Sequence, residues 1–97
     1  MIAAFSITPV GAGVSVADEV AEAVRIVRAS GLPNETNAMF TNLEGDWDEV
    51  MGVIKACLDK LSDAAPRCSV VIKIDAWPGQ GEGRMDEKVA EVERRLS

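Results

Sequence analysis

Polar side chains on the strand-like segments of this 97-residue chain could supply the hydrogen bonds that a small ligand needs. Ser6 and Thr8 alternate along one side of an N-terminal segment, and Thr41 shortly precedes Glu44 in a later one. Hydroxyls in a sheet must find partners when buried, either in a ligand, in the sheet or in an oligomer interface. Glu44, at a strand end, is either a ligand contact that accepts hydrogen bonds or balances a cation, or a solvated group beside a helix.

Amide and aromatic side chains nearby could recognise a flat ring. Asn34 and Asn37 serve either as turn residues or as amides that read a ring edge with both a donor and an acceptor. Phe40 and Trp77 either stack on a heteroaromatic ring or pack against a neighbouring subunit. The residue types alone leave these alternatives open.

Catalysis and metal binding have no support in the residue types. The chain has no histidine, and Cys57 and Cys68 do not form a CxxC pair, so histidine-dependent catalysis and the usual zinc sites are excluded. Both cysteines are expected to be reduced, largely buried thiols. Because no nucleophile is paired with a base, we expect no catalytic residue, no metal and no cofactor, and therefore not an enzyme.

Two other patterns have simpler explanations than a chemical site. The Gly79-x-Gly81-x-Gly83 run lacks the spacing and the Lys-Ser/Thr pair of a phosphate-binding loop, which favours a flexible connection. Lys73 and Asp75 lie two residues apart on one strand face, which favours a structural ion pair over a catalytic couple.

The charge balance narrows the choice of partners. Acidic residues outnumber basic ones by 16 to 10, giving a net charge of -6, so nucleic acid is not an expected partner. A cationic or neutral ligand suits this charge better than an anionic one. The apolar stretches are short and broken by charge, and the N-terminus lacks a basic and a long apolar region. We therefore expect neither export nor a membrane partner, and a cytoplasmic location.

The hydrophobic periodicity predicts alternating strands and helices. Ser15 can cap a first helix that Gly31 stops, and Asp46 with Glu49 forms a capping box for a second helix, which ends near Ala64. Strands are predicted at residues 2–9, 34–37, 38–44 and 69–77. A last amphipathic helix carries Met85, Val89, Val92 and Leu96.

The resulting order is βαββαβ with an additional C-terminal helix, which is the ferredoxin-like split βαβ arrangement. Residues 1–97 are therefore expected to form one α+β domain with an antiparallel sheet. Right-handed crossovers place both main helices on one face of this sheet. The other face is left to a partner chain, a ligand or the last helix, so a homo-oligomer is expected.

Several segments together resemble a known family. They are residues 6–11 (SITPVG), 30–32 (SGL), 39–45 (MFTNLEG) and 48–51 (DEVM), with residues 88–89 and 92–93 in the last helix. This combination is similar to the small, single-domain thiamine-binding proteins known as UPF0045 or DUF77. The resemblance extends over nearly the whole chain.

The resemblance implies a ferredoxin-like domain that assembles into dimers or tetramers through its sheets and binds thiamine, or its hydroxymethylpyrimidine part, without catalysis. The site residues that it implies by position are Ser6, Thr8, Asn34, Asn37, Met39, Thr41 and Glu44. The acidic chain suits the thiazolium cation, and Glu44 suits the aminopyrimidine edge. The alternative hypothesis is an oligomeric interaction module without a small-molecule ligand.

Overall fold

Strands and helices follow one another in the order that the sequence predicts. The structure, a computed structural model, describes residues 1–11 and 16–97, apart from the side chain of Val16. Its elements are β1 (Ile2–Val10), α1 (Val16–Ala29), β2 (Asn34–Thr36), β3 (Thr41–Glu44), α2 (Trp47–Ser62), β4 (Arg67–Asp75) and α3 (Arg84–Leu96). The predicted Ser15 cap lies outside the described residues.

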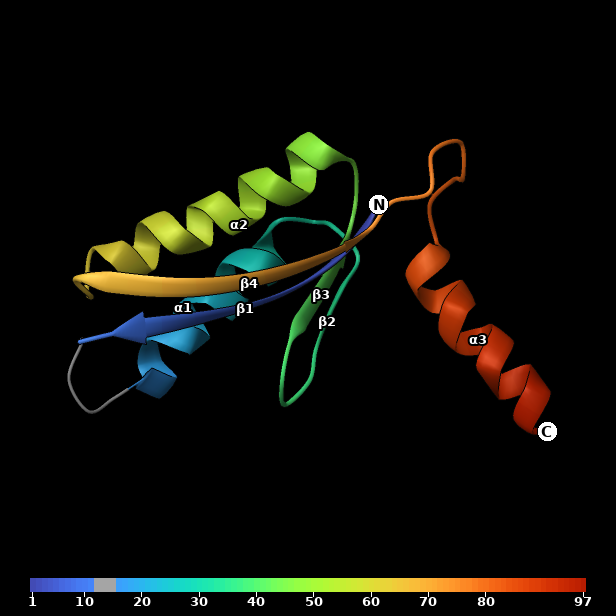
Figure 1. Ribbon diagram of the computed structural model, residues 1–97, viewed down its shortest axis with the longest axis horizontal. Helices are drawn as coiled ribbons and strands as arrows, with labels where there is room; N and C mark the ends of the chain where they lie inside the picture. The colour runs from blue at the N-terminus through green and yellow to red at the C-terminus, as the bar shows by residue number, and fades with distance from the viewer. Residues whose placement is uncertain (12–15) are drawn as a thin grey trace.

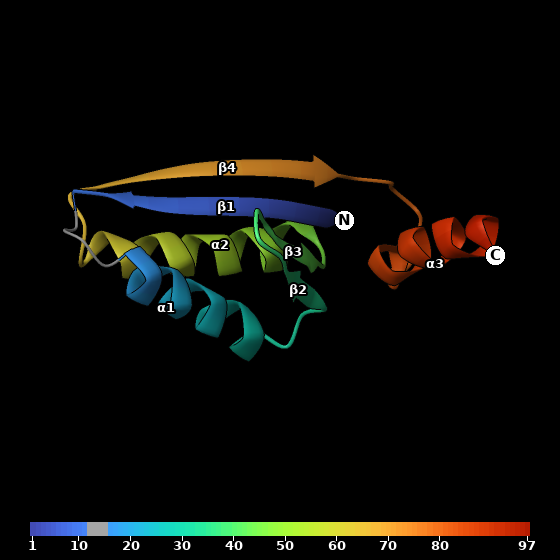
Figure 2. The same cartoon turned by 90° about the horizontal axis from the view of Figure 1, so that it is seen from below.

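One antiparallel sheet joins the four strands in the order β2-β3-β1-β4. β1 pairs with β4 from Ile2 to Val10, but with β3 only from Ile2 to Phe5. α1 and α2 lie on one face of the sheet, and α3 lies beyond its end (Figure 1 and Figure 2). This topology confirms the predicted α+β ferredoxin-like fold, with both crossover helices on the same side.

The hydrophobic core lies between the sheet and these two helices. Phe5 of β1 and Leu43 of β3 point toward the helices and are 2% and 0% exposed. Val27 packs against them from α1, and α2 contributes Val50, Ile54, Cys57 and Leu61. Full burial of one large apolar side chain contributes about 1.5–3 kcal/mol, so these contacts hold the sheet and the two helices together.

Local signals explain where the helices begin and end. Asp46 Oδ1 accepts a hydrogen bond from the Glu49 N–H at 2.8 Å, and Glu49 Oε1 accepts one from the Asp46 N–H at 3.0 Å. The predicted capping box of α2 is therefore confirmed. Gly31 has a φ of 81° just after the end of α1, the left-handed conformation that favours glycine after a helix.

The tip of the β2–β3 hairpin differs from the prediction. β3 begins at Thr41, later than the predicted start, and β2 ends at Thr36. Asn37 Oδ1 accepts hydrogen bonds from the N–H groups of Met39 and Phe40, both at 2.9 Å. A side chain that takes backbone donors in this way competes with strand pairing, so the tip is a turn and β3 is short.

The last strand also differs in its bounds. β4 covers residues 67–75 rather than 69–77, because it pairs along the whole of β1. Ile72 lies opposite Phe5 and therefore faces the helix layer, as predicted. It is nevertheless 36% exposed, since β4 is an edge strand of the sheet.

α3 extends away from the sheet and leaves the open sheet face uncovered (Figure 2). Its amphipathic pattern gathers Val89, Val92 and Leu96, which are 57%, 56% and 76% exposed. The sequence left this face to a partner chain, a ligand or the last helix. The structure shows that the last helix, α3, does not cover it. No helix in residues 1–11 and 16–97 is long and apolar enough to cross a membrane.

Candidate functional site

A cavity of about 250 Å³ lies where β1 loses its pairing with β3. Because β3 is short, the edge of β1 from Ser6 onward is open on that side. Residues 5–8 form one wall of the cavity, Val20 and Val24 of α1 form a second, and residues 36–41 of the hairpin form the third. The early end of the β1–β3 pairing therefore creates the cavity.

The structure divides the candidate residues into two groups. Those that line the cavity are Ser6, Thr8, Asn37, Met39 and Thr41. Asn34 and Glu44 do not line it and have partners elsewhere.

Two hydroxyls on β1 are available to a ligand. Ser6 is half-buried and Thr8 is exposed, and neither hydroxyl forms a hydrogen bond with another described residue. Ser6 lies opposite Val71 of β4, so the side chains of Ser6 and Thr8 belong to the open face of the sheet, and both residues line the cavity at the strand edge. The polar side chains of the hairpin, in contrast, form hydrogen bonds that stabilise the turn and the strand pairing.

The hairpin contributes polar groups that are partly committed to structure. Asn37 Oδ1 is occupied by the turn, whereas its Nδ2 has no partner among the described residues and can donate to a ligand. Thr41 is 8% exposed, and its Oγ1 lies 3.2 Å from the Oγ1 of Thr36 in a hydrogen bond. Sequence reasoning missed Thr36, although its position opposite Thr41 in a hairpin is the signal that would have revealed it.

Apolar side chains could pack on a ring bound in this cavity. Phe40 is half-buried and lines it, and Met39, at 74% exposed, stands on the hairpin tip. Trp77, the other stacking candidate, does not line it. The Arg84 guanidinium lies over the Trp77 ring, with its carbon 4.3 Å from the ring centroid, so this aromatic face is already occupied.

The side chain of Asn34 forms a hydrogen bond with the backbone of its own segment. Its Nδ2 donates to the carbonyl of Leu32 at 2.8 Å, which holds the chain as it enters β2. Of the two roles that the sequence left open for Asn34, the geometry matches that of a turn residue.

Glu44 lies at the other end of β3 from the cavity and is only 3% exposed. It is three positions along the strand from Thr41, a span of about 10 Å. Its Oε2 accepts from the N–H of Arg84 at 2.8 Å and its Oε1 from the N–H of Met85 at 3.2 Å. Gly83 at the N-cap of α3 has no side chain, so Glu44 satisfies these first helical donors from a distant strand.

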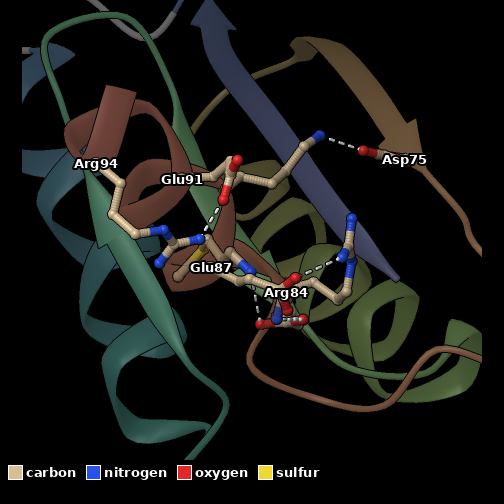
Figure 3. A network of polar contacts seen from close by, with 8 residues as sticks. Asp75, Arg84, Glu87, Glu91 and Arg94 are labelled. Carbon is tan, nitrogen blue, oxygen red and sulfur yellow. Dashed lines mark hydrogen bonds and ion pairs between the residues drawn. The ribbon is translucent and has the colours of Figure 1, made fainter. Parts of the chain in front are cut away.

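Further polar contacts hold the start of α3, and Figure 3 shows them around Arg84, Glu87 and Asp75. Arg84 pairs with Glu87 at 3.1 Å, and Lys88 pairs with Asp75 at the end of β4. The hydrogen bond and charge of Lys88 lower the pKa of Asp75. The ion pair predicted between Lys73 and Asp75 is not formed; Asp75 pairs instead with Lys88, which links β4 to α3, and Lys73 adds only the effect of its charge.

The cysteines behave as the sequence predicts. Both are free thiols; Cys57 is buried and Cys68 is half-buried. The Cys57 Sγ donates to the carbonyl of Ala23 at 3.4 Å, and burial raises its pKa to about 11. A thiol that stays protonated in the core is a packing residue and not a nucleophile.

The cavity is electrically neutral in its lining. None of the described residues around it is Asp, Glu, Lys or Arg. The side chains present can offer apolar contact, hydroxyls and one amide, all of which suit reversible binding of a small ring. The same set contains neither a base nor a charged group with which to activate a substrate.

Comparison with known proteins finds a matching family and related sequences. A family profile described as "Thiamine-binding protein" matches residues 3–93. A UPF0045 protein of Mycobacterium bovis is 52% identical over 97 residues, covering 99% of this chain and 94% of the relative. A UPF0045 protein of Synechocystis is 37% identical over 91 residues, covering 93% of this chain and 74% of the relative.

Solved structures have the same fold. The structure of a DUF77 domain from Bacillus cereus matches with a TM-score of 0.84 and 34% identity, covering 93% of this chain and 86% of that chain. A Thermotoga maritima protein, named for a tentative assignment to thiamine biosynthesis or salvage, matches with a TM-score of 0.81, covering 94% of this chain and 96% of that chain. At 21% identity, this second likeness shows the fold alone.

Proposed function

Because the chain belongs to the thiamine-binding protein family, we propose that it binds thiamine or a related hydroxymethylpyrimidine compound in the cavity beside β1. The observation that supports this most directly is the set of uncommitted polar groups there. The Ser6 and Thr8 hydroxyls and the Asn37 Nδ2 can form hydrogen bonds along a ring edge, while Phe40 packs against a ring face.

The proposed role is binding without chemical conversion. Acid–base or nucleophilic catalysis needs a group whose pKa or charge suits proton transfer, and the described lining offers only hydroxyls, an amide and apolar side chains. Incubation with thiamine should therefore return thiamine unchanged, as followed by chromatography of the ligand. Conversion of the ligand at a rate proportional to protein concentration would refute this part of the proposal.

Self-association is a further part of the proposal. The sheet face opposite α1 and α2 is uncovered, and Val71 on that face is 56% exposed. Val89 and Leu96 of α3 add exposed apolar surface beyond the end of the sheet. Burying such surface against a second copy of the chain would remove it from water, so we propose a homo-oligomer.

A cytoplasmic location completes the proposal. Cys57 and Cys68 are both free, which is typical of proteins in reducing compartments. Fractionation of the source cells with an antibody against the chain tests it: recovery in the secreted fraction would contradict it.

Isothermal titration with thiamine and with hydroxymethylpyrimidine tests the binding function. Thr8→Val removes a hydroxyl and keeps the branched shape, and the loss of one hydrogen bond should weaken binding about 2- to 10-fold. Ser69→Ala is the matched control, since Ser69 lies opposite Thr8 on β4 but outside the cavity. It should bind like the parent protein.

Two results would overturn the proposal. Absence of saturable heat with either compound at millimolar concentration would remove the ligand-binding function. It would favour the second candidate, an interaction module whose exposed residues, such as Val89 and Leu96, serve assembly alone. Equal losses in Thr8→Val and Ser69→Ala would move the site away from the cavity.

A further inference from the structure

The apolar side chains of α3 form a single stripe, the α3 seam, which consists of Met85, Val89, Val92 and Leu96. The spacing of four, three and four residues is that of the a and d positions of a coiled coil. Met85 is half-buried, and the other three residues are more than half exposed, so nothing in the described part of the chain covers them. A stripe of this spacing is normally buried against a second helix.

We propose that the α3 seam packs against the same seam of a second copy of the chain, with the two α3 helices parallel. The pairing rests on the proposed self-association, and it names the surface and the orientation that this association uses. α3 extends beyond the end of the sheet (Figure 2), so a second α3 can lie along it without meeting the sheet of the same chain.

The charges beside the α3 seam have opposite signs on its two flanks. Lys88 and Arg95 occupy the g positions on one flank. Asp86 and Glu93 occupy the e positions on the other flank. In a parallel pair, the g flank of each helix faces the e flank of its partner, so basic side chains meet acidic ones on both sides. This charge complementarity identifies a second α3 as the partner that the seam fits.

The same charges oppose an antiparallel pair. In that orientation each flank faces the same flank of the partner. Lys88 would then approach the partner's Arg95, and Asp86 would approach the partner's Glu93. Because like charges repel on both sides of the seam, the charge pattern selects the parallel orientation.

The start of α3 is already held by its own chain. A helix of 13 residues is marginal by itself in water. Here, however, Glu44 accepts hydrogen bonds from the first turn of α3, and Lys88 pairs with Asp75 at the end of β4. The helix is therefore formed before a partner arrives, and pairing only has to bury the seam.

The acidic flank of the seam is unoccupied. Asp86 and Glu93 have no partner among the residues that the structure describes. Lys88 is five positions before Glu93, which is the spacing at which a g residue meets an e residue of a parallel partner. An ammonium group has three N–H donors, so Lys88 can hold Asp75 and the partner's Glu93 at the same time.

A disulfide at a seam position tests the orientation. Val92→Cys brings two introduced thiols together only in a parallel pair, because like positions of the seam then face each other. Cys68→Ala removes the half-buried native thiol from the background, and Cys57 is buried. Oxidised glutathione should convert most of this variant to a covalent dimer on non-reducing electrophoresis. Ala90→Cys, exposed on another face of α3, is the matched control and should stay monomeric on the gel.

Charge reversal tests the flanks. Neutralising one exposed charge changes association little, so the test reverses a charge. Glu93→Lys places a lysine against the partner's Lys88 and should raise the dissociation constant in sedimentation experiments at least about 5-fold. This effect should shrink at high salt, because salt screens the repulsion. Glu82→Lys changes the net charge equally in the exposed loop before α3 and should stay within about 2-fold of the parent protein.

The outcomes separate the α3 pairing from self-association in general. An oligomeric protein in which Val92→Cys forms no covalent dimer, or forms it no faster than Ala90→Cys, overturns the pairing while self-association stands. Cross-linking between mixed Met85→Cys and Leu96→Cys proteins would show an antiparallel pair and also overturn it. Equal effects of Glu93→Lys and Glu82→Lys would remove the role of the flanks. A monomeric parent protein would refute self-association and the pairing together. Circular dichroism of each variant establishes that it is folded.

Discussion

The Glu44 carboxylate accepts a hydrogen bond from the backbone N–H of Arg84, forty residues further along the chain, at 2.8 Å. A second bond, from Met85 at 3.2 Å, places both carboxylate oxygens on the first turn of α3. A carboxylate here satisfies donors that have no partner within the helix and favours the positive end of its dipole. Glu44 thus connects the sheet to the C-terminal helix.

Replacing Glu44 should therefore loosen α3 and not ligand binding. We expect Glu44→Ala to weaken the attachment of α3 by about 1–2 kcal/mol, as for loss of a helix cap with a charged acceptor. Hydrogen exchange of the α3 amides should accelerate about 10-fold, while affinity for thiamine stays within 2-fold. Glu35→Ala, an exposed acid on neighbouring β2, is the control. Loss of binding with unchanged α3 exchange would return Glu44 to the ligand site.

At low pH, protonation of Asp75 should weaken the attachment of α3 to the sheet. Lys88 depresses the pKa of this exposed carboxyl below its usual 3.8, so the ion pair stabilises the attachment of α3 above pH 3.8. That stabilisation is lost as the pH falls through the depressed pKa. An NMR titration of Asp75 should show the low midpoint, and Lys88→Met should raise it toward 3.8. An unchanged midpoint in Lys88→Met would show that Lys88 does not cause the shift.

Alkali should destabilise the fold through Cys57. Burial raises the pKa of this thiol from 9.0 to about 11, so between these values the unfolded chain loses a proton that the folded chain keeps. Stability must therefore fall as the pH rises through this range, by an amount on the order of 2 kcal/mol. Urea denaturation of Cys57→Ala at several pH values should show a smaller dependence, whereas Cys68→Ala should retain it. The reverse order would refute the assignment.

The turn at the hairpin tip can be separated from recognition at Asn37. Asn37→Ala removes the acceptor of two backbone hydrogen bonds and should lower the free energy of unfolding by about 1–2 kcal/mol. Asn37→Asp keeps that acceptor but removes the free amide donor. It should unfold near the parent's urea midpoint yet bind hydroxymethylpyrimidine more weakly. Equal binding by Asn37→Asp and the parent would exclude the amide from recognition.

Oligomer formation should depend on the exposed apolar residues of α3. Val89→Glu places a charge in the stripe formed with Val92 and Leu96, and should lower the molar mass measured by light scattering if α3 lies in the interface. Glu93→Gln changes an exposed side chain of the same helix and should leave the molar mass unchanged. A monomeric parent protein would refute the proposed self-association outright.

The elements of the fold could be predicted because each carries its own local signal. The alternation along β1, the capping box at Asp46 and Glu49, and the stop at Gly31 all depend on residues close together in sequence. The hairpin tip could not be bounded, because residue 37 can either continue a strand or take backbone donors, and this competition is decided by geometry.

The candidate site could be predicted only in part for a similar reason. Ser6 and Thr8 lie on a strand whose periodicity fixes their side, and Thr41 follows from the same alternation in β3. The partner of Glu44, in contrast, lies on α3, and no pattern in the sequence states where a helix after a glycine-rich loop will lie. The role of Glu44 could not be predicted because its partner Arg84 is 40 residues away in the sequence.

β1 is a central strand over its first half and an edge strand on one side over its second half. In the second half, amide protons that point toward β4 are shielded, whereas those that point toward the cavity meet solvent, so every other residue should exchange quickly. A ligand in the cavity would slow only the fast set. The strand therefore contains its own reporter of occupancy, which needs neither a label nor a substitution.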